Sequence, residues 1–310
     1  MDRDHIDLLA MCRVPGVSWH FLAREAQRPD GIERLRTGHA AEESPDAIKS
    51  LAALTAAQDD LGHRQRTVEE MLKGTEGDGT LLTTVLDEDY PVNLRMIYNL
   101  PPFLFYRGTL RSDDALSVAV VGTRKPSSAG LSRASEMARL LVDAGVTVLS
   151  GLARGIDTAA HQACLDAGGR TIAVLGSGIR RVYPPENGIL AEQITEHGAV
   201  VSQFWPDAPP TSYTFPRRNV VTSGMSQGTV VIEASATSGA KMQARLAIEH
   251  GKQVFLLHSL VTEREWARRY LDRPRVHEVA DVADIVRLLR PAAVQRNRAM
   301  ERVQIPLTLF

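Results

Sequence analysis

The spacing of hydrophobic and polar positions changes near residue 115. Before this point, apolar residues such as Leu51, Leu54, Val68 and Met71 recur at intervals of three or four, which is typical of amphipathic helices. The segment RVPGVSW at 13–19 interrupts the first helix, because proline and glycine break helices. We therefore predict a small helical N-terminal domain over residues 1–80.

From residue 116, short apolar runs alternate with segments of helical spacing that often end in glycine. Such alternation predicts βαβ units and a parallel sheet. The runs lack alternating polarity, as expected where helices cover both faces of the sheet. The predicted fold class is α/β, an extended Rossmann-like doubly wound parallel sheet over residues 116–260. The six predicted strands are LSVAVVG, VTVLSG, RTIAVLGSG, AVVSQF, GTVVIEAS and KQVFLL.

Three further segments flank this domain. Residues 81–115 are rich in proline and aromatic residues and predict a connecting segment. Residues 261–290 predict a C-terminal α/β extension with a helix, a short strand and a final helix. Residues 291–310 are first arginine-rich and then apolar, and we expect a loosely held tail.

Composition narrows the class of protein. Hydrophobic residues make up 44% and charged residues 24%, the balance of a globular protein with a sizeable core. Two cysteines are too few for a disulfide framework or a four-cysteine zinc site. No apolar run reaches the ~18–20 residues that span a membrane, and the acidic N-terminus is unlike a signal peptide. We expect a cytoplasmic protein without membrane partners. Its net charge of -1 means that a polyanion must meet a local basic patch.

Basic residues follow five of the predicted strands, at the edge where their carboxyl ends meet. In open α/β sheets this edge is where ligands bind. Glycine permits close approach of the backbone, helix N-termini offer free amides, and arginine donates in pairs to phosphate oxygens. We predict a phosphate-bearing ligand, against the alternative that each arginine is merely solvated. The candidate residues are Gly122, Thr123, Arg124 and Lys125; Arg154; Arg180; Phe215, Arg217, Arg218 and Asn219; and Lys241.

Familiar cofactor motifs are missing. The first strand is followed by GTRKPSSAG rather than G-x-G-x-x-G, and there is no Walker motif, so we expect no cofactor. Phe215 stands beside two arginines, a combination that suits an unstacked base and its phosphates. The alternative is a small loop-core residue beneath Pro216.

Taken together, these loops resemble the DprA (also called Smf) family of DNA-processing proteins. The resemblance is carried almost continuously over residues 118–257. The strings that match are VAVVGTRKPSSAG, VLSGLARGIDTAAHQACLDAGGRTIAVLGSGIRRVYPPEN, FPRRNVVTSGMSQGTVVIEA and ARLAIEHGKQVF.

The resemblance implies an extended Rossmann-like fold that binds single-stranded DNA. It also implies a homodimer that passes incoming strands to the recombinase RecA during transformation, the uptake of DNA. Carried over from the family's motif by position, Phe215 would stack on a base. Lys125 and Arg180 are not carried over from the family; we add them to the site because of their loop positions alone. The residues that would contact phosphate or surround the ring are Gly122, Thr123, Arg124, Arg154, Arg217, Arg218 and Asn219.

The chain departs from the family's pattern at several places. SGAKMQA at 238–244 stands where many members read SGSLITA, so Lys241 is an added charge. The residues after 257 lack the family's serine- and glycine-rich loop, and 261–310 predict no winged-helix domain. Near the N-terminus, Trp19 replaces the second glycine of a helix-hairpin-helix pattern, which predicts a helical fold with weakened DNA contact.

Catalytic alternatives rest on isolated residues. Glu233 stands near the glutamate of phosphoribohydrolases of this fold, but their PGGxGT signature is absent; we expect it to pair with an arginine and hold the pocket in shape. His161 and Cys164 lie one helical turn apart without further metal ligands, and buried cysteine is common. Ser150 lacks a nucleophile motif, and Asp157 is expected to cap a helix. We therefore predict no metal site and no catalytic residues.

The prediction is a single-stranded DNA-binding protein for DNA processing and recombination, not an enzyme. One alternative is a nucleotide-sensing or nucleotide-hydrolysing protein that uses the same pocket. Another is a regulatory subunit of a partner protein, such as a toxin or defence enzyme.

Overall fold

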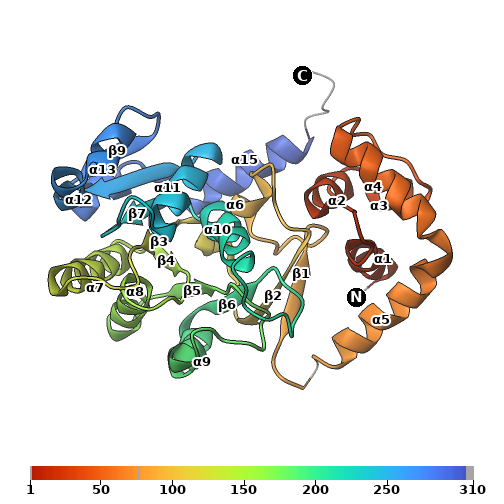
Figure 1. Cartoon of the computed structure of the whole chain (residues 1–310), viewed down its shortest axis with the longest axis horizontal. Coiled ribbons are helices and arrows are strands. Elements are labelled where there is room, and N and C mark those ends of the chain that lie inside the picture. Colours follow the sequence, from red (N-terminus) through yellow and green to blue (C-terminus); the bar gives the residue numbers. More distant parts are fainter. Residues whose placement is uncertain (1, 76, 305–310) are drawn as a thin grey trace.

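The computed structural model describes residues 2–75 and 77–304 of the chain. A lobe of helices at the N-terminus lies beside a larger part built on one sheet (Figure 1). Among the described residues, no helix combines the length and apolar character that crossing a membrane requires.

The N-terminal lobe is helical, as predicted. Its first helix ends at Cys12 and the second begins at Trp19, on either side of the proline–glycine segment. The side chains of Asp2, Ser18 and Ser44 accept hydrogen bonds from backbone N–H groups in the first turns of three helices, which fixes where those helices begin. The helices are α1 (Arg3–Cys12), α2 (Trp19–Ala26), α3 (Gly31–Arg36), α4 (Pro45–Ala56) and α5 (Leu61–Lys73).

The larger part contains a nine-stranded sheet in the order β1-β2-β6-β5-β4-β3-β7-β8-β9. Strands β3 to β9 pair in parallel. The six predicted strands are β3 to β8, and the short strand expected after them is β9. The parallel strands are β3 (Ser117–Val121), β4 (Thr147–Ser150), β5 (Thr171–Val174), β6 (Ala199–Ser202), β7 (Gly228–Val231), β8 (Gln253–Leu257) and β9 (Val276–Val279).

Residues 81–115 do more than connect the two parts. They supply β1 (Leu81–Thr84) and β2 (Phe103–Gly108), and β2 pairs antiparallel with both β1 and β6. Two strands of this sheet were therefore missing from the sequence prediction. Each is short and lies beside prolines, so its pattern resembles that of an irregular linker.

Helices cover both faces of the sheet. Helices α7 to α9 pack beside one another on one face, and α10 and α11 pack together on the other (Figure 1). The expected tail instead contains α15, which packs near α6, whereas residues 305–310 lie outside the described part. The helices are α6 (Val92–Arg95), α7 (Ser128–Asp143), α8 (Ile156–Asp166), α9 (Gly188–His197), α10 (Thr214–Met225), α11 (Gly239–Glu249), α12 (His258–Glu263), α13 (Glu265–Tyr270), α14 (Val282–Val286) and α15 (Ala292–Gln304).

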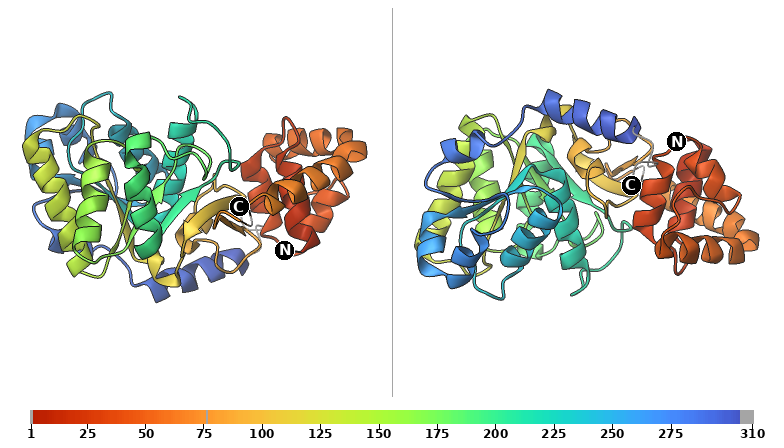
Figure 2. Two further views of the ribbon diagram at one scale, coloured as in Figure 1. Left: turned by 90° about the horizontal axis from the view of Figure 1, so that it is seen from below. Right: turned by 90° about the horizontal axis from the view of Figure 1, so that it is seen from above.

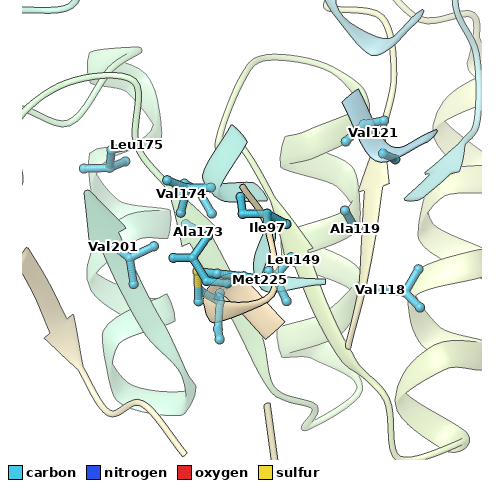
Figure 3. Packing of buried hydrophobic residues seen from close by; sticks show 14 of the residues in the cluster. Ile97, Val118, Ala119, Val121, Leu149, Ala173, Val174, Leu175, Val201 and Met225 are labelled. Carbon is cyan, nitrogen blue, oxygen red and sulfur yellow. The ribbon is translucent and has the colours of Figure 1, made fainter. Parts of the chain in front are cut away.

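The core lies along the central strands. Val118, Leu149 and Val174 are buried, and Met225 at the end of α10 and Ile97 pack near them (Figure 3). All residues of β3 to β7 are buried. This explains the uninterrupted apolar runs in the sequence, since both faces of a parallel sheet are covered.

Aromatic rings join the helical lobe to the sheet. Trp19 packs against Phe103 and Trp205, with ring centroids 5.0 and 5.9 Å apart, and its indole donates to the Cys12 carbonyl. The tryptophan at the position of the missing glycine is therefore a packing residue. The lobe lies at one end of the molecule, beyond β1 and β2 (Figure 2).

The chain order reverses at the centre of the sheet. From β3 the chain proceeds outward through β4, β5 and β6, then returns through α10 to β7 on the other side of β3. A crevice opens beyond the carboxyl ends of the strands at such a switch point. The predicted site residues are expected to meet there.

Candidate functional site

A cavity of about 540 Å³ lies at this switch point and is called the carboxyl-edge cavity. Loops after β3, β4 and β7 line it together with the first turns of α10. Seven of the predicted site residues belong to its lining, namely Gly122, Thr123, Arg124, Lys125, Phe215, Arg218 and Asn219.

The loop after β3 is held in place by Glu233. Its carboxylate accepts hydrogen bonds from the Ser127 hydroxyl at 2.7 Å and the Ser127 backbone N–H at 3.3 Å. The backbone N–H of Thr123 donates to the Glu233 carbonyl at 2.8 Å. The sequence prediction expected an arginine partner, whereas the observed partner is a serine. Glu233 thus positions the loop that carries Arg124 and Lys125.

Gly122 allows this loop to lie close to α8. A Cβ atom at Gly122 would come within 2.4 Å of the Ile156 side chain. A larger residue would push the loop and its two exposed cations out of the cavity. The glycine therefore acts by close packing.

Phe215 lies in the first turn of α10 rather than in a loop. Its ring packs against Gly176, where an added Cβ would stand 2.6 Å from Cδ1, and against the Tyr183 ring at 5.7 Å. The Arg124 guanidinium lies over the ring, with Cζ 5.1 Å from the centroid, an arrangement in which the cation is attracted by the ring's electrons. Phe215 is only partly buried, so its ring and the Arg124 guanidinium together form an accessible surface of the cavity.

Arg218 is a buried cation that also lines the cavity. Its Nη1 donates to the carbonyl oxygens of Gly151 and Val174, the latter at 2.9 Å, and its Nε donates to Asn219 Oδ1 at 3.0 Å. Burial lowers the pKa of the guanidinium, and the nearby Asp157 carboxylate opposes that shift. Arg218, oriented by Asn219, therefore joins the ends of β4 and β5, in addition to placing a charge at the cavity wall.

Asp157 has a different role from the expected helix cap. Its carboxylate accepts from the backbone N–H groups of Gly151 at 3.1 Å and Ala153 at 3.3 Å, which precede α8. Burial raises the pKa of this carboxyl group, and the positive charge of Arg218 acts in the opposite direction. Asp157 shapes the loop after β4 and lines the cavity.

Four predicted site residues lie outside the cavity lining. Arg154 is exposed and pairs with Glu186, and Arg180 pairs with Asp78 at 2.5 Å and with Asp207 at 3.1 Å. These cations have acidic partners within the chain, so they are less available to a polyanion than loop position alone suggests.

The other two outlying cations lie over aromatic rings. Arg217 is exposed, with Cζ 5.5 Å from the Trp19 ring of the helical lobe. Lys241 lies 5.7 Å from the Trp266 ring and 6.0 Å from the Tyr270 ring. Lys241 is turned toward α13, although its neighbours Ala240 and Met242 line the cavity.

The predicted set of site residues leaves out much of the cavity lining, including Ser238, and it also leaves out Tyr183. Tyr183 flanks Phe215, and Ser238 lines the cavity and begins α11 by accepting from the Lys241 backbone N–H at 3.3 Å. A serine before a helical pattern is a recognisable signal for a helix start. Nothing in the local sequence indicates the approach of Tyr183, because it depends on the distant α10.

The other residues considered for metal binding or catalysis are buried and have partners within the fold. His161 is buried with Nδ1 2.7 Å from Thr171 Oγ1, and burial lowers its pKa to about 3. Burial raises the pKa of the Cys164 thiol to about 12, and the Ser150 hydroxyl donates to the Val120 carbonyl. In the described part of the chain, no three His, Cys, Asp or Glu residues are grouped as metal ligands would be.

The fold and cavity define a class: a Rossmann-like α/β protein with a cationic crevice at its switch point. The sequence model of the family described as DNA recombination-mediator protein A matches residues 81–288. The chain belongs to this family, which confirms the resemblance found in the sequence. The match begins at β1, so it includes the two strands that the sequence prediction missed.

Curated relatives carry related names. Protein Smf from Escherichia coli is 40% identical over 205 residues, which cover 66% of this chain and 55% of that protein. Protein Smf from Synechocystis is 35% identical over 256 residues, covering 80% of this chain and 63% of the relative. The chain thus matches between half and two thirds of the length of these relatives.

Solved structures show the same fold. DNA processing protein A from Streptococcus pneumoniae has a TM-score of 0.73 and 26% identity, and the match covers 94% of this chain and 99% of that one. The protein of the same name from Helicobacter pylori has a TM-score of 0.59 and 25% identity, over 66% of this chain and 94% of that one. That structure is described as giving insight into a unique single-stranded DNA binding mode.

Proposed function

We propose that this protein binds single-stranded DNA in the carboxyl-edge cavity and serves DNA processing and recombination. The observation that carries the proposal is the pairing of Arg124 with the half-buried ring of Phe215 at the switch point. A ring offers a face to any base, and an adjacent guanidinium offers paired donors to phosphate. The single-stranded DNA binding described for the Helicobacter pylori relative supports it.

Binding on this site requires a rearrangement of Arg124. In the free protein its guanidinium lies over the ring that a base would use. When a strand enters, the base replaces the guanidinium on Phe215, and Arg124 turns to a phosphate beside Lys125. Little is lost in this exchange, since a cation–ring contact is replaced by base stacking and by a charge-assisted hydrogen bond.

The remaining contacts keep the site in shape before DNA arrives. Glu233 fixes the loop after β3, and Asp157 and Arg218 fix the loop after β4. A preformed site loses less conformational entropy on binding. Arg217 lies at the surface and would extend the basic path toward the helical lobe, whereas Arg154, paired with Glu186, would contribute less.

The finer parts of the role follow from the family and are proposals of the same kind. They are the formation of a homodimer, the transfer of strands to RecA, and a part in DNA uptake during transformation. Each concerns a partner surface, and the carboxyl-edge cavity would present the strand to it.

Fluorescence anisotropy with labelled single- and double-stranded oligonucleotides of equal length tests the proposal. Arg124→Gln is expected to weaken binding of every single-stranded sequence alike. In a plot of the logarithm of the binding constant against the logarithm of the salt concentration, the magnitude of the slope should fall by about 0.7, the value for one phosphate contact on a single strand. Arg66→Gln, an exposed arginine on α5, is the charge-matched control. Equal affinities of wild type and Arg124→Gln would contradict the proposal.

A further inference from the structure

A second cavity, of about 480 Å³, lies at the opposite edge of the sheet and is called the amino-edge cavity. Gln227, which precedes β7, and Gln253, which begins β8, are part of its lining. Segments far apart in the sequence supply its cations. These are Lys252, Arg275, Arg290 and Arg298.

The backbone position of Arg290 is set by the buried Gln227. The Gln227 amide donates to the Arg290 carbonyl at 2.7 Å and accepts from the Arg290 backbone N–H at 2.8 Å. Both hydrogen-bonding groups of the Arg290 backbone are therefore engaged by one side chain. This clamp holds the chain between α14 and α15 against the sheet, and it leaves the Arg290 side chain exposed.

Arg275 and Lys252 are also held by backbone atoms. Arg275 adopts a left-handed conformation with φ of 64°, and its guanidinium donates to the Gly251 carbonyl at 2.8 Å. An arginine in this conformation is strained, and such strain persists where the surroundings impose it, often at binding sites. The Lys252 ammonium donates to the carbonyls of Asn93 and Gly224 at 3.1 Å.

The charge of the cavity is unbalanced. Among the described side chains, its lining includes one carboxylate, Glu249, which pairs with Arg245 outside the cavity at 3.5 Å. Among the side chains that the structure describes, which end at residue 298, no carboxylate lies within 4.0 Å of the side chains of Arg275, Arg290 or Arg298. Three guanidinium groups thus border one concave surface without an ion-pair partner in this part of the chain.

An exposed ring stands at the rim. The side chain of Tyr98 is 58% exposed and meets the edge of His250, with centroids 5.8 Å apart. Burial lowers the pKa of His250 to about 4, so at neutral pH this imidazole adds no charge. Tyr98 therefore offers a flat apolar face next to the arginines.

Cations at this edge can stabilise the fold without any ligand, because helix C-termini present carbonyl groups that have no hydrogen-bond partner within the helix. Lys252 serves this purpose at the end of α10 and Arg275 at the end of α11. Arg290 and Arg298 lie on the C-terminal segment, and in the part of the chain whose side chains are described they donate to no helix carbonyl through their guanidinium groups. They remain as donors for a ligand.

We propose that the amino-edge cavity is a second binding site, for a nucleotide unit whose phosphate is held by Arg290 and Arg298 and whose base lies on Tyr98. Arginine pairs match phosphate oxygens, and a tyrosine face accepts any base. The unit is either a free nucleotide or part of a nucleic-acid strand, since both present the same phosphate chemistry.

Isothermal titration of the full chain at about 50 mM salt, where phosphate contacts are strong, tests this site. The probes are adenosine monophosphate and 5′-phosphorylated hexathymidylate. The variant is Arg290→Gln/Arg298→Gln, and the matched control is Lys49→Gln/Arg66→Gln, which removes two exposed cations from the helical lobe. A Phe215→Ala/Arg124→Gln variant removes the carboxyl-edge site, so the two sites are scored separately.

We expect the double variant to weaken one binding component at least tenfold, while the control and the carboxyl-edge variant leave that component intact. If the double variant loses binding of adenosine monophosphate, the ligand of this site is a free nucleotide. If it loses binding of hexathymidylate alone, the ligand is part of a nucleic-acid strand. The proposal is wrong if neither probe shows a component that depends on Arg290 and Arg298. It is also wrong if every component disappears with the carboxyl-edge variant.

Discussion

The two edges of the sheet collect positive charge by different means. At the carboxyl edge, the Arg124 guanidinium lies over the Phe215 ring, and Arg218 donates to two carbonyls at strand ends near the buried Asp157 carboxylate. At the amino edge, backbone carbonyls accept from the charged groups of Lys252 and Arg275, and the Gln227 amide holds only the backbone of Arg290. Helix N-termini favour anions at the first edge, whereas helix C-termini disfavour them at the second. An anion site at the amino edge therefore needs additional arginines beyond those that satisfy carbonyls.

The largest expected effect is a loss of stability, which distinguishes a structural arginine, Arg218, from the arginines proposed to bind DNA. Arg218→Met removes the donor of two buried carbonyl groups and the positive charge near Asp157. We expect a loss of about 3–5 kcal/mol in the free energy of unfolding, as when one member of a buried charged network is removed. Urea denaturation measures it, with Arg218→Lys as a partial rescue because the ammonium keeps the charge. A loss below about 1 kcal/mol would show that Arg218 does not hold the strand ends.

Phe215→Ala tests the ring at the carboxyl edge. Loss of base stacking is expected to weaken single-stranded DNA binding by about 1–3 kcal/mol, the range for one base on an aromatic ring. Phe215→Trp keeps a stacking face and should retain most of the affinity. Anisotropy titration gives both values. If alanine and tryptophan bind DNA equally well, the ring does not stack on a base.

Two buried histidines make stability depend on pH. The pKa of His161 is lowered to about 3 and that of His250 to about 4 by burial. Below pH 6.5 the unfolded chain takes up protons that the folded chain excludes, so stability falls as the pH falls from 6.5 toward 4. The slope is up to about 1.4 kcal/mol per pH unit for each histidine.

Denaturant titrations at several pH values measure this slope in wild type and in His161→Gln. The variant should show a shallower fall of the free energy of unfolding between pH 6.5 and 4, whatever its absolute stability. Parallel curves for the two proteins would contradict the buried, neutral state of His161.

The smallest effect is expected outside the cavity. Arg154 is exposed and paired with Glu186, and exposed pairs contribute little to stability because water screens them. Arg154→Gln should leave the thermal midpoint unchanged and weaken DNA binding far less than Arg124→Gln. A loss of affinity as large as that of Arg124→Gln would move the DNA path toward α8 and away from the ring.

The parallel sheet was predictable because its signal is local. Each of the six strands β3 to β8 is a short apolar run, and a glycine follows closely after β3, β4 and β5. Strands β1 and β2 were missed because their place in the sheet depends on antiparallel pairing with each other and with the distant β6. Helix α15 was missed because its only large apolar residues are Val294, Met300 and Val303, which are too few to show a helical period.

The sequence predicted which segments form the candidate site, but not the direction in which each side chain points. Arg217 and Arg218 are neighbours on α10, and consecutive residues on a helix point about 100° apart. Arg217 consequently faces Trp19 at the surface, while Arg218 is buried among strand ends. The sequence shows that two cations follow Phe215, but only the helix and its packing determine which one reaches the cavity.

Photocrosslinking tests the central claim most directly. An oligonucleotide that carries 5-iododeoxyuridine couples on irradiation to an aromatic side chain on which the base lies, and mass spectrometry locates the modified tryptic peptide. We predict the main crosslink in residues 182–217, at Phe215, and its loss in Phe215→Ala. Crosslinks confined to other peptides, with none at Phe215 in the wild type, would contradict DNA binding in the carboxyl-edge cavity.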